Sequence, residues 1–187
     1  FLCLLPFIYV ISVSLTDPSV YVPLTLTLVP KRLSLTIYRY ILSSPAFIDA
    51  LKSTVYITVL GTAINIAVTF TMAYGLTKRG LPHRKIIMAL VLFALLFDAG
   101  LIPNYLLVRS LGLMNTYWAI ILPVATNAWS LIVARSFLDS IPSELEESAK
   151  IDGASDITIF LRIILPLSTA GIATLTLFFA VAHWNVY

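Results

Sequence analysis

Charged side chains are scarce in this 187-residue chain: Asp, Glu, Lys and Arg make up 11% of the residues, whereas apolar residues make up 59%. Soluble domains carry about a quarter charged residues on average. A surface with so little charge would aggregate in water, so the composition indicates a protein whose solvent is lipid. The formal net charge is only +3, and the basic residues form no stripe that could follow a phosphate backbone. We therefore expect no nucleic-acid partner.

Residues that support metal binding or catalysis are also few. The single cysteine, Cys3, excludes an internal disulfide framework, and His183 has no second ligand candidate at a suitable spacing, so we expect no metal site. The G-x-x-x-x-G-K-[ST] loop that cradles nucleotide phosphates is absent. An intramembrane enzyme using Asp98 and His183 would need paired carboxylates or an H-E-x-x-H pattern, and the sequence has neither. We expect no enzymatic activity and no cofactor in this chain.

The two ends lack the features of natural boundaries. The chain begins FLCLLPFIYV, with no Met and no basic segment typical of a secretory signal, and it ends in the still hydrophobic FFAVAHWNVY. We expect both ends to lie inside membrane helices, so that the sequence is a fragment.

Long windows without charge divide the chain into spans. A helix that crosses the hydrocarbon core needs about 20 apolar residues, and the apolar runs here are continuous rather than alternating, which excludes a barrel. We therefore predict an all-α integral membrane protein, a polytopic helical bundle. Five spans are expected, the first and last of them truncated: residues 1–15, 53–76, 86–107, 117–135 and 166–187.

The basic residues predict the orientation of these spans. Four of them lie within residues 77–85, namely Lys78, Arg79, Arg84 and Lys85, whereas residues 108–116 hold only Arg109. Because positive loops stay in the cytoplasm, we expect 77–85 and 136–165 inside, and 17–50 and 108–116 outside. Lys31, Arg32 and Arg39 in the long segment 17–50 weaken the contrast.

Residues 140–168, SIPSELEESAKIDGASDITIFLRIILPLS, are the most informative stretch. Residues 139–156 carry six of the chain's nine acidic side chains. Ser143 and Glu146 match a capping box, Asp152-Gly153 is a turn signal, and a second helix is expected at 156–165. Its apolar face would consist of Ile157, Phe160, Leu161 and Ile164. An acidic helix–turn–helix with an apolar face favours docking to a partner over lying on an anionic membrane, where such loops are usually basic.

The letters ESAKIDGA (147–154) and IILP (163–166) resemble the EAA signature of binding-protein-dependent ABC importer permeases. That signature reads E-A-A-x-x-D-G-A and then, about eight residues on, I-x-L-P; here Ser148 replaces an Ala. Residues 100–123, the SIPSELEE before the motif and HWN at 183–185 resemble the maltose-permease-like carbohydrate-uptake group, in particular permeases for lipo- or oligosaccharides. The alternative is a permease of the same fold for a non-sugar solute such as an amino acid or ion.

The resemblance implies a single transmembrane permease domain over 1–187, of the type I ABC importer kind and with its sixth span missing. It would be a multi-pass protein of a bacterial-type inner membrane, with residues 140–165 as a cytoplasmic coupling loop. The implied partners are a cytoplasmic ATPase subunit that holds ATP and Mg, a second permease subunit in a heterodimer, and an extracellular or periplasmic solute-binding protein. The implied residues of the loop that couple to the ATPase are Glu147, Ala149, Asp152, Gly153, Ala154, Leu165 and Pro166. Of these, Asp152 is expected to cap the following amides.

Polar and aromatic residues within the spans are candidates for a translocation path. A charge at bilayer depth costs several kcal/mol unless it faces protein or water, so Asp98 marks either a path or a wet outer interface. Ala99-Gly100 and Pro103, which follow it, can open the helix near the outer surface. Interhelical hydrogen bonds explain Asn65, Asn127 and Asn185 equally well, and an interfacial belt explains Trp118, Trp129 and Trp184. The candidates are Asp98, Asn127, Trp129, Trp184 and Asn185.

Overall fold

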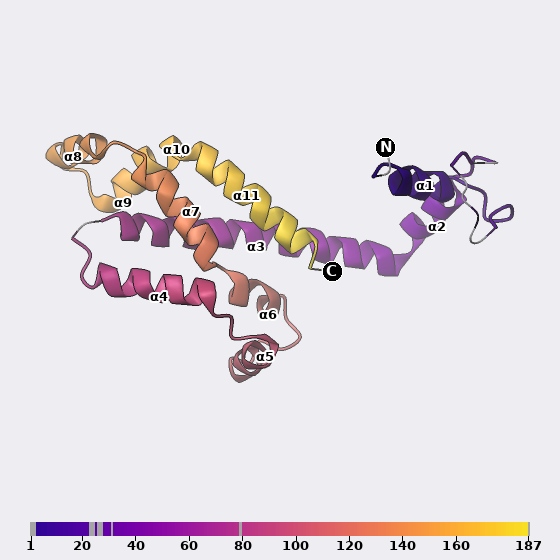
Figure 1. Ribbon diagram of the computed structural model, residues 1–187, viewed down its shortest axis with the longest axis horizontal. Helices are drawn as coiled ribbons and strands as arrows, with labels where there is room; N and C mark the ends of the chain where they lie inside the picture. Colours follow the sequence, from indigo (N-terminus) through magenta and orange to yellow (C-terminus); the bar gives the residue numbers. More distant parts are fainter. Residues whose placement is uncertain (1–2, 23–24, 26–27, 31, 79, 187) are drawn as a thin grey trace. The chain divides into compact units, whose positions relative to one another are not determined.

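The computed structural model of the chain describes residues 3–22, 25, 28–30, 32–78 and 80–186 (Figure 1). Two of the basic residues counted above, Lys31 and Arg79, lie outside the described residues. The chain divides into two compact units, residues 1–53 and 54–187. The fold of the described part is all-helical, as predicted.

The helices follow one another along the chain with short connections. Their bounds are α1 Leu5–Ser14, α2 Thr36–Ser43, α3 Pro45–Thr77, α4 Arg84–Leu96, α5 Leu101–Ser110, α6 Trp118–Ile121, α7 Ala128–Asp139, α8 Ser143–Ile151, α9 Asp156–Ile159, α10 Leu165–Leu167 and α11 Thr169–Trp184. A 3-10 turn, Leu122–Val124, follows α6, and a π-helical turn, Phe160–Ile164, joins α9 to α10.

The first unit is held together by a few polar contacts. Thr16 and Leu33 form an isolated antiparallel bridge. Next to it, the amide of Ser34 donates to the carbonyl of Leu15 at 2.9 Å. The hydroxyls of Ser14 in α1 and Tyr38 in α2 lie 2.7 Å apart. These contacts join the end of α1 to the beginning of α2.

The core of the second unit lies between α3, α7 and the helices that follow α8. Its buried members are Phe70, Ala73, Tyr74, Leu76, Leu131, Ala134, Leu138, Ile159, Ile164, Leu175 and Phe179. Two small residues allow close helix approach: a Cβ at Gly61 would lie 2.6 Å from His183 Nε2, and one at Gly171 would lie 2.7 Å from Phe137 Cγ. Small residues at such contacts are typical of helix packing in membranes.

The predicted spans correspond to helices that are mostly bent. In the described residues, α3 is the one helix long and apolar enough to cross a membrane by itself. Three bent pairs raise the count to four if each is one span: α4 with α5, α6 with α7, and the helical run 156–167 with α11. The first predicted window, 1–15, contains only the ten residues of α1. The windows 86–107 and 117–135 each contain a bend between two helices, and in the window 166–187 the bend falls at Ser168, before α11.

Each break has a local cause. Between α4 and α5, which meet at 119°, Asp98 Oδ1 accepts the Gly100 amide at 2.8 Å, and Gly100 has a φ of +80°. The 54° bend before α7 follows the 3-10 turn that contains Pro123. The 79° bend before α11 falls at Ser168, whose hydroxyl bonds the carbonyl of Ile164 at 2.7 Å. Proline, glycine and side chains that bond the backbone are the usual causes of such kinks.

Candidate functional site

The predicted helix–turn–helix of residues 140–165 is present, and its turn has a defined geometry. After α8, the amide of Gly153 donates to the carbonyl of Lys150 and the amide of Ala154 to that of Ala149, both at 3.0 Å. Together with the φ of +82° at Gly153, these two bonds form a Schellman motif, which ends a helix with a residue in the left-handed conformation. Asp152 precedes the turn as the last residue of the helix end.

The helix that follows the turn is capped by a residue other than the one predicted. Ser155, not Asp152, is the N-cap of α9: its hydroxyl oxygen accepts the Thr158 amide at 3.3 Å. The reason is backbone geometry, because Asp152 still belongs to the end of α8. A second capping prediction was also wrong. Pro142 occupies the N-cap of α8 without a side-chain cap bond, and Glu146 bonds elsewhere.

Glu146 forms an ion pair with Lys78, the residue that follows α3. The two side chains are only 22% and 24% exposed, respectively. Lys78 Nζ also donates to Tyr74 Oη at 2.7 Å and lies 3.9 Å from the centre of the Tyr74 ring. That ring stacks on Phe160 with centroids 4.8 Å apart. Burial lowers the pKa of Lys78, but the hydrogen bonds to Glu146 and Tyr74 and the charge of Glu146 outweigh it, so the pKa is raised.

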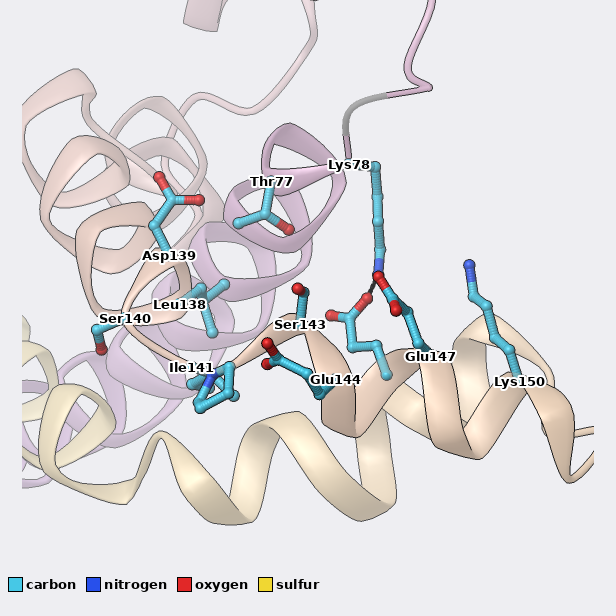
Figure 2. Close-up of a pocket in the computed structure, with 12 residues that line it drawn as sticks. Thr77, Lys78, Leu138, Asp139, Ser140, Ile141, Ser143, Glu144, Glu147 and Lys150 are labelled. Atoms are coloured by element: carbon cyan, nitrogen blue, oxygen red, sulfur yellow. Dashed lines mark hydrogen bonds and ion pairs between the residues drawn. The ribbon is translucent and has the colours of Figure 1, made fainter.

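A cavity of about 680 Å³ opens beside this ion pair (Figure 2). Its walls are the end of α3, the end of α7 and one side of α8; the close-up shows Lys78 reaching from the end of α3 toward the acidic side chains of α8. Four carboxylates and two amines line it: Asp139, Glu144, Glu146, Glu147, Lys78 and Lys150. The cavity is therefore acidic overall.

Some of these charged side chains form ion pairs within the described residues, and others do not. Besides Lys78–Glu146, Arg135 Nε lies 3.2 Å from Asp139 Oδ2, and Lys150 Nζ lies 3.1 Å from Asp156 Oδ1. Within the described residues the remaining acidic side chains of 139–156 form no ion pair; these are Glu144, Glu147 and Asp152. Glu144 and Glu147 are three residues apart on an exposed helix, so they lie on the same face of α8.

The apolar face of the second helix differs from the prediction. Ile159 and Ile164 are buried in the core, whereas Ile157 is 72% and Leu161 54% exposed. The π-helical turn inserts a residue into the α-helical period, so side chains beyond Phe160 are rotated from their predicted positions. Pro166 explains this turn, because its ring has no N–H and would clash with the carbonyl four residues earlier. Ile157 precedes the π-helical turn and lies exposed after the Asp152-Gly153 turn; Ile151 of α8, just before that turn, is 87% exposed.

The remaining residues predicted to couple to a partner lie at the base of this segment. Ala149 and Ala154 are half-buried and pack against the core, so they fix the turn to the bundle. Leu165 is half-buried, and Pro166 is exposed in the short α10, immediately before the bend into α11. Leu165 and Pro166 thus directly precede a change of direction of the chain.

The predicted translocation residues are all exposed, and the structure does not gather them at one point. Asp98 lies in the break between α4 and α5 rather than inside a helix. Asn127 is the N-cap of α7, where its Oδ1 accepts the Ser130 amide at 2.8 Å. Trp129 contacts Phe178 edge-on at 5.5 Å, while Trp184 and Asn185 line a small cavity with Thr58 at the end of α11.

A row of polar side chains lies on α3, and of its members the sequence singles out only Asn65. Thr62, Asn65 and Thr69 are buried; Asn65 Nδ2 donates to the Val124 carbonyl at 2.9 Å, and the hydroxyls of Thr69 and Thr126 lie 3.0 Å apart. Their spacing of three and four residues places them on one face of an apolar helix, and this spacing is the sequence signal that could have identified the row. Lys78, Tyr74 and Phe160 were also missed as a group, since Lys78 was interpreted only as a charge that sets orientation.

Comparison with known proteins agrees with this fold. Residues 9–186 match the family described as "Binding-protein-dependent transport system inner membrane component". The structure of a bacterial ABC transporter that imports the acidic polysaccharide alginate superimposes with a TM-score of 0.93 at 30% identity, over 100% of this chain and 66% of that one. The fold is thus that of an all-helical ABC importer permease. The chain belongs to the family of binding-protein-dependent transport system inner membrane components, which confirms the multi-pass inner-membrane prediction.

Several curated relatives are similar over nearly the whole chain. The polygalacturonan/rhamnogalacturonan transport system permease protein YtcP of Bacillus subtilis (strain 168) is 48% identical over 100% of this chain and 65% of its own length. LplC of the same organism is 47% identical over 97% and 62%. The trehalose/maltose transport system permease protein MalG of Thermococcus litoralis is 32% identical over 100% and 68%. The chain thus spans less than two thirds of the length of the first two relatives.

Proposed function

We propose that this chain is the greater part of a permease subunit in an ATP-driven importer. An external binding protein delivers the solute, and a separate cytoplasmic ATPase subunit, which holds ATP and Mg, drives the movement. A second permease subunit completes the path across the membrane. The family supports the importer class, and one observation carries the mechanism. In the part of the chain that the structure describes, the segment of α8, turn and α9 presents carboxylates without an ion pair beside exposed isoleucines.

We infer that this segment, residues 140–165, is the cytoplasmic element that docks on the ATPase. Lys78 and Lys150 already pair with Glu146 and Asp156 of the segment, so its acidic side chains without an ion pair in the described residues are Glu144, Glu147 and Asp152. Ile151 and Ile157 would otherwise be exposed to water, and apolar groups beside unpaired carboxylates are typical of a docking surface. The partner surface is therefore expected to be basic with an apolar centre.

The solute is proposed to be a sugar, in particular an oligosaccharide. This rests on the relatives: YtcP is named for polygalacturonan and rhamnogalacturonan, MalG for trehalose and maltose, and the matching structure is described as an alginate importer. Asp98, Asn127, Trp129, Trp184 and Asn185 remain the proposed residues of the path. Exposed tryptophans offer flat apolar faces to sugar rings, and the exposed asparagine amides offer donors and acceptors to hydroxyls.

The docking role is tested by removing one free carboxylate. Glu147→Ala in the complete transporter should weaken binding of the ATPase subunit, because it removes an anion from a basic partner surface. Truncating one member of a buried interfacial charge pair costs about 2–5 kcal/mol, so we expect Kd to rise at least thirtyfold, roughly. The measurement is titration of the ATPase onto the purified membrane subunits in nanodiscs.

The matched control is Asp156→Asn, which removes the same charge from the same segment. Lys150 already neutralises Asp156 within the chain, so ATPase binding should change little. The loss in Glu147→Ala should also be the same whichever sugar is offered. Full ATPase affinity in Glu147→Ala, or an equal loss in Asp156→Asn, would contradict the assignment of Glu147 to the docking surface.

A further inference from the structure

Lys78 has a second role beyond adding positive charge to a loop. Its amine contacts groups of two elements that are distant in sequence: Tyr74 near the end of α3, and Glu146 in α8. Tyr74 in turn stacks on Phe160, at the start of the π-helical turn. One cation and one ring thus join the end of α3 to both helices of segment 140–165.

Both members of the ion pair are about three-quarters buried, so water and salt screen the attraction less than at an open surface. The amine also lies over the face of the Tyr74 ring, where the ring quadrupole attracts a cation. By contrast, Lys85, in the first turn of α4, is exposed, and no ion pair involves it in the described residues. The two lysines carry the same charge but differ in packing.

The helix to which Lys78 fixes the segment leads into the middle of the bundle. α3 is 33 residues long and unbroken, and its Asn65 and Thr69 bond the residues just before α7. A displacement of α8 that is transmitted to the end of α3 is therefore carried along a stiff helix to the break before α7. A chain of packed and bonded groups of this kind is the physical medium through which sites are coupled.

We propose that Lys78 is a positioning residue that ties the ATPase-docking segment to α3 through Glu146 and Tyr74, so that movement of α8 is passed to the membrane helices. This rests on the proposed function of the segment. In this proposal Lys78 acts through Glu146, whose charge is thereby withdrawn from the docking surface.

The test uses the complete transporter, reconstituted in liposomes with its binding protein, and measures solute taken up per ATP hydrolysed. Lys78→Met keeps the apolar stem of the side chain and removes the charge. We expect uptake per ATP to fall about two- to thirtyfold, the range for changes along a coupling network. The charge swap Lys78→Glu with Glu146→Lys should restore most of the ratio, whereas either single reversal should not. Lys85→Met, the matched control, should leave it unchanged.

The outcomes separate this proposal from the docking proposal. The role of Lys78 is overturned if uptake per ATP is equal in Lys78→Met and Lys85→Met. It is also overturned if the charge swap lowers uptake per ATP as much as the single reversals do. If Lys78→Met does not accumulate in the membrane, the role of Lys78 is judged from the uptake per ATP of Lys78→Arg and of the charge swap, since both keep an ion pair. A merely structural role would lower the amount of folded transporter but leave uptake per ATP unchanged. The docking proposal is judged separately, from the ATPase affinity of Glu147→Ala.

Discussion

The turn at Gly153 offers the sharpest single perturbation of the docking segment. Its φ of +82° lies in the left-handed region, where β-branched residues are strongly disfavoured. A Cβ added there meets nothing within 4 Å, so the penalty of Gly153→Val comes from the backbone and not from a clash with neighbours. Such strain costs about 1–3 kcal/mol, which reduces the population of the native turn relative to alternatives by about 5- to 150-fold.

The two hydrogen bonds that close the turn predict the effect of Gly153→Val on the direction of α9. If residue 153 leaves the left-handed region, the bonds from the amides of 153 and 154 to Lys150 and Ala149 are lost, and α9 departs from α8 in a different direction. The contact of Glu146 with Lys78 precedes the turn, so α8 itself remains attached to α3. We therefore expect Gly153→Val to insert normally but to lose stimulation of ATP hydrolysis by the solute-loaded binding protein.

The assay is stimulated ATP hydrolysis by the reconstituted transporter, with two comparison variants. Gly80→Val is the matched control, because the Gly80 φ is outside the left-handed region and its Cβ would also meet open space. Gly153→Asn should lie between wild type and Gly153→Val, since Asn tolerates the left-handed conformation better than other residues with a Cβ. Equal stimulated rates in Gly153→Val and Gly80→Val would refute the role of the turn.

Two further predictions concern orientation and the path. In a Cys3→Ser background, Gly80→Cys should react with an impermeant thiol reagent only from the cytoplasmic side and Ser110→Cys only from outside; labelling of both from one side would contradict the predicted orientation. Asp98→Asn should leave ATPase binding unchanged, because the amide oxygen can still accept the Gly100 N–H, while the loss of charge lowers uptake. Unchanged uptake would show that Asp98 serves only the turn between α4 and α5.

The turn of segment 140–165 could be predicted because its determinants are local. Asp152-Gly153 at the end of an acidic helix is sufficient to indicate a left-handed residue, and its position was predicted correctly. The partner of Glu146 could not be found in this way, since Lys78 is 68 residues away in sequence. A capping box with Ser143 satisfied the local pattern, but the tertiary ion pair with Lys78 is what forms.

The apolar face of the second helix was mispredicted for a different reason. The interpretation assumed an α-helical period through Phe160–Ile164, whereas this stretch is a π-helical turn. Hydropathy windows likewise assume regular, straight helices for the spans. They detect apolar length but not direction, so the 119° bend at 97–100 was not visible as a bend, although Asp98, Gly100 and Pro103 together were consistent with an opening of the helix there.

The distribution of breaks gives α3 a distinct place among the helices of the second unit. The bent pairs change direction at 97–100, 125–127 and 168, where one helix ends and the next begins. α3 has no such interruption in its described residues, and the ring of His183 packs directly on its Gly61. A continuous helix moves as a unit, whereas a broken one absorbs displacement at its break. In the proposed coupling, motion that enters through α8 and Lys78 is preserved along α3 and expressed at the breaks that α3 contacts, beginning with the one that Asn65 bonds at Val124.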